Sequence, residues 1–204
     1  MSIVFLLELI GTAAFAVSGA LAASRKNMDI FGFCVLALMP AVAGGTLRDI
    51  ILDRHPVFWV ANTAYVAVAL AAAVIVFFTA YRPGWRKRIL IWMDALGLAL
   101  FATLGTQISL NANAGPLVAI MLGVATAVTG GMIRDIICNE IPLVLTREIY
   151  ATAAFTSSLA FVSASYVGVP AEIALIGSVS AGFTVRALAI VYDWSLPPPR
   201  VRKS

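Results

Sequence analysis

The chain has 204 residues, of which 61% are hydrophobic and 12% are charged, and its formal net charge is +4. A soluble domain carries about twice this charged fraction, so the composition excludes an ordinary soluble fold. One histidine and two separated cysteines, Cys34 and Cys138, exclude a recognised zinc site and a disulfide framework. We therefore expect no metal and no cofactor, and the sequence contains no nucleophile–base pattern that would indicate an enzyme.

Seven apolar runs follow one another, and each is long enough to cross the membrane as a helix of about 20 residues. They cover residues 3–23, 30–52, 57–81, 89–110, 116–138, 147–168 and 170–192. The connecting segments are too short to separate domains, so residues 1–194 are predicted to form a single transmembrane domain. Residues 195–204 hold three prolines in a row and three basic residues, which predicts a disordered, basic cytoplasmic tail. Glu8 interrupts the first run and no basic residue precedes it, which favours a retained helix over a signal peptide.

The basic residues indicate how the chain is oriented in the membrane. Only Arg54 lies in one set of alternate loops, whereas the other set and the tail hold ten basic residues: Arg25, Lys26, Arg82, Arg86, Lys87, Arg88, Arg147, Arg200, Arg202 and Lys203. Basic loops remain on the cytoplasmic side. This pattern predicts a multi-pass protein of the cell (inner) membrane with its N-terminus outside and its C-terminus cytoplasmic. It also accounts for the positive net charge without a nucleic-acid partner.

An internal repeat with an offset of 86 residues organises the chain. The matched pairs are Glu8 with Asp94, Gly11 with Gly97, Phe15 with Phe101, Gly19 with Gly105, Gly44-Gly45 with Gly130-Gly131, and Arg48-Asp49 with Arg134-Asp135. Each copy (residues 3–81 and 89–168) holds three apolar runs, and an odd number of crossings inverts the second copy relative to the first. The predicted fold is an all-α integral membrane protein with seven transmembrane helices, arranged as two inverted three-helix repeats plus a seventh helix at 170–192.

The strongest local signal is the duplicated Gly-Gly-x-x-Arg-Asp element. Two consecutive glycines within a span weaken the helix by about 1 kcal/mol each relative to alanine. An opened turn in the membrane must line a cavity or be covered by protein. We therefore predict kinks that line a central path, formed with neighbouring hydroxyls by Gly44, Gly45, Thr46, Gly130, Gly131, Thr126 and Thr129. The alternative is that these glycines permit close packing between helices.

Ionisable residues within the spans form the second signal, because each costs several kcal/mol unless it is paired or hydrated. They are Glu8, Arg48, Asp49, Asp94, Arg134, Asp135 and Arg186. Shared depth predicts the pairs Glu8–Arg48 and Asp94–Arg134, since neighbours such as Arg48 and Asp49 point about 100° apart on a helix. Arg186 would neutralise or gate the inner half. The alternative is a static scaffold of buried salt bridges.

The paired element, within two three-helix repeats followed by a seventh helix, resembles the prokaryotic members of the trimeric intracellular cation (TRIC) channels over residues 3–193. The resemblance implies a homotrimer, an hourglass-shaped subunit with its own pore, glycine kinks on the second and fifth helices, and potassium as the permeant ion. Residues 89–110 lack the Lys-Glu-Val element with which the animal members bind phosphoinositide. Bacterial sequences of this family are also labelled glycine transporters.

Two hypotheses about function follow. In a passive cation channel, carbonyl groups at the breaks and the hydroxyls of Thr46, Thr126 and Thr129 would replace part of the ion's hydration shell. In a secondary transporter of a small amino acid such as glycine, helix N-termini at Thr46 and Met132 would hold the carboxylate. Both hypotheses place the protein among membrane lipids, and the channel has monovalent cations as its partners.

Overall fold

The computed structural model describes residues 3–80, 83–146 and 149–194, and the regular secondary structure in these ranges is entirely helical. The predicted tail, residues 195–204, lies outside the described residues. In chain order the helices are α1 (Ile3–Arg25), α2 (Ile30–Ile51), α3 (Phe58–Ala61), α4 (Ala64–Thr79), α5 (Pro83–Asn111), α6 (Pro116–Ile137), α7 (Leu143–Thr146), α8 (Ile149–Tyr166) and α9 (Ala171–Val191).

Five of these helices are long and apolar enough to cross a membrane: α1, α2, the Trp85–Asn111 part of α5, α6 and α9. Helices α4 and α8 coincide with two more predicted spans but are shorter, with 16 and 18 residues. The prediction of one continuous helix over 57–81 is wrong, because α3 and α4 are separate. The Asn62 side chain accepts a hydrogen bond from the Ala64 amide at 3.0 Å. Such a local bond competes with helix continuation and starts α4 afresh.

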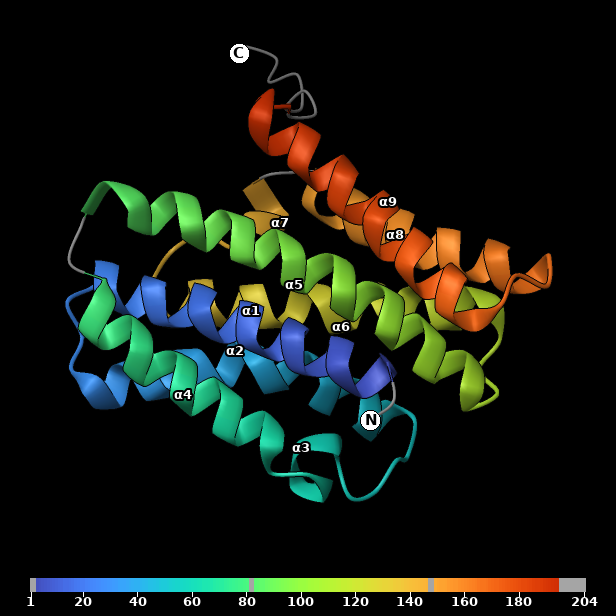
Figure 1. The fold of residues 1–204 in the computed structure, drawn as a ribbon, viewed down its shortest axis with the longest axis horizontal. Coiled ribbons are helices and arrows are strands. Elements are labelled where there is room, and N and C mark those ends of the chain that lie inside the picture. The colour runs from blue at the N-terminus through green and yellow to red at the C-terminus, as the bar shows by residue number, and fades with distance from the viewer. Residues whose placement is uncertain (1–2, 81–82, 147–148, 195–204) are drawn as a thin grey trace, which may run out of the picture.

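The long helices form a bundle of two triplets (Figure 1). Helices α1, α2 and α4 pack together, as do α5, α6 and α8, while α1–α5 and α2–α6 contacts join the triplets and α9 packs on α5 and α8. Helix α1 begins at one end of the bundle and α9 finishes at the opposite end (Figure 1). We call the end where α1 begins the N-face and the end where α9 finishes the C-face.

Contacts between the triplets are reciprocal, as a two-fold axis between them requires. The Phe15 and Phe101 rings stack with centroids 5.5 Å apart and an interplanar angle of 3°. A Cβ added to Gly11 would lie 3.1 Å from the Phe101 ring, and one added to Gly97 would lie 2.9 Å from the Phe15 ring. Each glycine therefore makes room for the aromatic ring of the opposite triplet. The contact of Gly11 with Phe101 therefore has its counterpart, 86 positions along, in the contact of Gly97 with Phe15.

Candidate functional site: a glycine crossing between two buried charge clusters

Helices α2 and α6 touch backbone to backbone at the centre of the bundle. A Cβ added to Gly44 would lie 1.9 Å from the Thr126 carbonyl oxygen, and one added to Gly130 would lie 2.4 Å from the Pro40 carbonyl oxygen. Both pairs are buried. The 86-residue offset relates one pair to the other, because Gly44 corresponds to Gly130 and Pro40 corresponds to Thr126. We call these four residues the glycine crossing.

The glycine pairs do not interrupt their helices, and the predicted kinks stay a prediction. Helix α2 runs from Ile30 to Ile51 and α6 from Pro116 to Ile137 without interruption. Gly45 and Gly131 lie against side chains, because an added Cβ would be 2.5 Å from the Phe58 ring and 2.5 Å from the Tyr150 hydroxyl, respectively. The glycines thus serve close packing, which small residues provide at helix interfaces in membranes.

The three threonines near the glycines direct their hydroxyl hydrogens into their own helices. Thr46 donates to the Val42 carbonyl at 2.7 Å, and its oxygen accepts from the Trp59 indole at 2.9 Å. Thr126 and Thr129 donate to the carbonyls four residues earlier, each at 2.6 Å. Thr126 is buried and Thr129 is half-buried. The hydroxyl oxygens of Thr126 and Thr129 retain lone pairs that can accept.

A buried ionic network lies at the C-face end of α6. The Arg134 guanidinium donates to Asp94 Oδ1 at 2.6 Å, to Ser18 Oγ at 2.5 Å and, through Nε, to Asp135 Oδ1 at 2.9 Å. The second Asp135 oxygen accepts from the backbone amide of Leu143, the first residue of α7, at 2.9 Å. Arg134 and Asp94 are 1% and 0% exposed, so this charge pair lies fully inside the protein. The predicted Asp94–Arg134 pair is therefore confirmed.

The N-face end of α2 carries the equivalent arginine–aspartate unit. Arg48 donates through Nε and Nη2 to Asp49 Oδ1 at 2.9 and 2.8 Å, and Asp49 Oδ2 accepts from the amide of Phe58, the first residue of α3, at 2.9 Å. The prediction that sequence neighbours would not pair is wrong in both repeats. The long arginine side chain folds back far enough to overcome the angular separation. Each aspartate thereby joins an arginine to the start of a short helix.

Glu8 breaks the symmetry between the clusters. The predicted Glu8–Arg48 pair is wrong: no ion pair joins these two residues, both of which lie in the described part of the chain. Instead, Glu8 Oε2 accepts from the Tyr65 hydroxyl at 2.5 Å. The Tyr65 ring packs on Phe58, with centroids 4.8 Å apart, so the bond belongs to the same N-face cluster.

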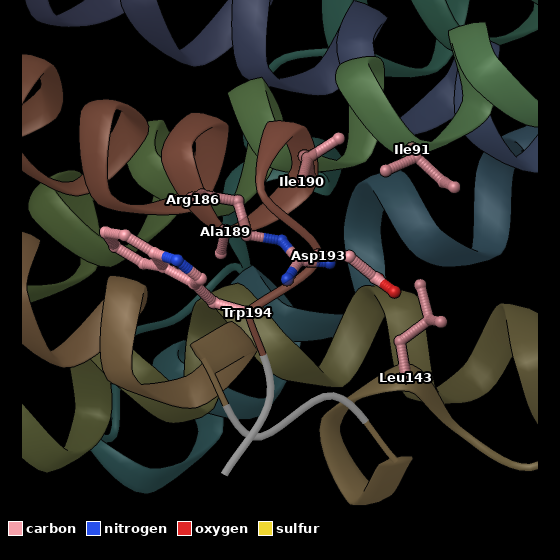
Figure 2. Close-up of a pocket in the computed structure, with 7 residues that line it drawn as sticks. All are labelled: Ile91, Leu143, Arg186, Ala189, Ile190, Asp193 and Trp194. Carbon is pink, nitrogen blue, oxygen red and sulfur yellow. The ribbon is translucent and has the colours of Figure 1, made fainter.

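Arg186 lies beside the C-face network. Its guanidinium stands 4.9 Å from the centroid of the buried Tyr150 ring. Arg186 lines a cavity of about 90 Å³, and the other lining residues (Figure 2) are Ile91, Leu143, Ala189, Ile190, Asp193 and Trp194. A second cavity of about 170 Å³ shares Ile91 and Leu143 with the first and reaches Arg134 and Asp135. The C-face network is thus bordered by open space.

Sequence reasoning did not identify Ser18, Tyr65 or Tyr150 as members of these clusters. Serine and tyrosine are common in membrane helices, and none of the three is duplicated at the 86-residue offset. Their positions became informative only when the packed helices placed them beside Arg134, Glu8 and Gly131.

Comparison with known proteins identifies the family. A family model described as "Glycine transporter" matches residues 5–81 and again 91–166, once for each repeat. The UPF0126 inner membrane protein YadS of Escherichia coli K12 is 40% identical over 200 residues, covering 96% of this chain and 95% of YadS. The UPF0126 membrane protein YvgT of Bacillus subtilis is 32% identical over 197 residues, covering 94% of each chain.

Solved structures add a second line of evidence. The TRIC trimeric intracellular cation channel orthologue from Rhodobacter sphaeroides matches with a TM-score of 0.91 and 47% identity, over 95% of this chain and 100% of that chain. The chain belongs to the TRIC family. A further TRIC cation channel structure matches over 100% of both chains, with a TM-score of 0.88 and 33% identity. As a TRIC-family protein, the chain resembles solved channels, and the double match of the family model supports the repeat found in its sequence.

Proposed function

We propose that this TRIC-family protein is a passive channel for monovalent cations, with potassium as the main permeant ion and a pore in each subunit of a homotrimer. The observation that carries this proposal is the TM-score of 0.91, at 47% identity, to a trimeric cation channel. The proposal includes seven membrane crossings, with the N-terminus outside and the C-terminus cytoplasmic.

The two charge clusters place four carboxylates near the two ends of the proposed path. The N-face cluster contains the carboxylates of Glu8 and Asp49 with Arg48, and the exposed Arg54 lies 3.5 Å from Asp49 Oδ1. The C-face network contains the carboxylates of Asp94 and Asp135 with Arg134, and Arg186 lies nearby. Rings and clusters of carboxylates favour cations at channel mouths. We place the conducting path between these clusters, along the interface of α2 and α6.

The glycine crossing is the proposed gate on this path. Gly44 and Gly130 have no side chains, and the facing carbonyl oxygens occupy the space that a Cβ would need. An ion can therefore pass this level only when α2 and α6 move apart. When they separate, the carbonyl oxygens of Pro40 and Thr126 become available to replace water around a cation.

Proteoliposomes test the proposal against the alternative of a glycine transporter, which is the description of the matching family model. The vesicles are loaded with potassium, and their potassium efflux and their uptake of labelled glycine are measured side by side, with protein-free vesicles as the control. A channel releases potassium down its gradient and does not concentrate glycine. Accumulation of glycine above the external concentration, driven by an ion gradient, would replace the channel with a carrier.

A further inference from the structure

The carboxylates of the two clusters differ in how tightly they are neutralised. Asp94, Asp135 and Asp49 each lie within 2.8 Å of an arginine nitrogen and are at least nine-tenths buried. Glu8 is partly exposed, and among the described residues its carboxylate is bonded by the neutral hydroxyl of Tyr65 and by no arginine or lysine. The Glu8 charge is therefore the least compensated of the four.

Two departures from the repeat explain this difference. Ser18, which accepts a hydrogen bond from Arg134 on the C-face side, corresponds to Leu104 under the offset, so Arg48 has no such hydroxyl to bond. Tyr65 corresponds to Ala151, but the neighbouring Tyr150 hydroxyl lies close to Asp94 on the C-face side, so the two acids differ in their bond to arginine rather than in having a tyrosine nearby. The Glu8 carboxylate therefore bonds a neutral donor, whereas Asp94 bonds the Arg134 guanidinium.

We propose that the Glu8 carboxylate is the residue that sets cation preference at the N-face mouth, by raising the local concentration of cations there. This inference rests on the proposed channel function and adds a specific residue to it. The hydrogen bond from Tyr65 is donated to the Glu8 side chain by a neutral group and brings no opposite charge to it. Glu8 is six residues into α1 and partly exposed, and the proposal requires that cations from the N-face solution reach it.

The effect of this charge depends on salt concentration. A unit charge about 5 Å from a passing cation, at the dielectric constant of water, changes the local cation concentration by about two- to four-fold. At 1 M salt the screening length falls to about 3 Å, and most of this attraction disappears. We therefore expect Glu8→Gln to lower unitary conductance by about two- to four-fold in 0.1 M KCl, with little change in 1 M KCl.

Two variants at this bond separate charge from structure. Glu8→Gln removes the charge but retains an oxygen that can accept from Tyr65, whereas Tyr65→Phe removes the bond but retains the charge. The proposal predicts reduced low-salt conductance and a lower potassium-to-chloride preference for Glu8→Gln, and a smaller loss of both for Tyr65→Phe, which retains the charge. Equal losses in Glu8→Gln and Tyr65→Phe would assign a structural role to the bond and overturn the proposal.

A matched control is Glu172→Gln, which removes an exposed carboxylate from the first turn of α9 and is expected to leave conductance unchanged. All variants are compared in planar bilayers after size exclusion has shown the same oligomer as the unaltered protein. If Glu8→Gln conducts like the unaltered channel in 0.1 M KCl, the inference about Glu8 is wrong while the channel function stands. If the unaltered protein itself gives no unitary currents, the proposed function fails instead.

Discussion

Replacing Gly44 with alanine tests the glycine crossing directly. The new Cβ would lie 1.9 Å from the Thr126 carbonyl oxygen, whereas real Cβ atoms essentially never approach closer than 3.0 Å. Helices α2 and α6 must therefore separate by about 1.1 Å at this point. The obstacle is backbone, so no side-chain rotation can relieve the contact.

The magnitude follows from two opposing effects. Overpacking a tight interface costs about 1–3 kcal/mol, and a rigid obstacle favours the upper end of this range. Alanine in place of glycine within a helix contributes about 1 kcal/mol of stability. We expect a net loss of about 2 kcal/mol, which for a chain of this size lowers Tm by about 4–8 °C.

The assay is thermal unfolding in detergent, with Gly177→Ala as the matched control. Gly177 lies within α9, and an added Cβ there meets nothing within 4 Å, so the same substitution should raise Tm slightly. The two variants are thus expected to shift Tm in opposite directions. If Gly44→Ala were as stable as Gly177→Ala, the backbone contact at the crossing would not exist in the protein.

Two further predictions concern the ion pairs. Arg134→Leu leaves the carboxylates of Asp94 and Asp135 buried without their arginine, so it should cost about 3–5 kcal/mol in the free energy of unfolding. Adding Asp94→Asn should recover part of this loss. An unchanged Tm for the single variant would contradict the network. Glu140→Gln removes bridges to Arg25 and Lys26, whose side chains are about a third exposed. It should cost no more than about 1 kcal/mol, and less at high salt; a loss of several kcal/mol would refute this assignment.

The span positions and the repeat could be predicted because they depend on local composition. A helix that crosses hydrocarbon needs a fixed length of apolar residues, and this requirement is visible in any single sequence. The short helices α3 and α7 were missed because each has only four residues. Both are instead held by a bond from the first backbone amide to Asp49 or Asp135, which no periodicity reveals.

The details of the site could not be predicted, because they depend on what lies opposite each residue. A glycine pair has the same local sequence whether or not another helix packs against it, and the Thr126 carbonyl opposite Gly44 becomes visible only in the packed structure. Depth alone suggested the same pairing for Glu8 as for Asp94. Tyr65, 57 residues away in the chain, bonds Glu8 and makes its environment different.

The most direct test of the central claim is the reversal potential of the reconstituted protein in planar bilayers under a ten-fold KCl gradient. A cation channel gives unitary current steps whose reversal potential lies close to the potassium equilibrium potential, about 59 mV for a single charge, and does not follow chloride. Absence of steps, or a reversal potential at the chloride equilibrium value, would contradict the account.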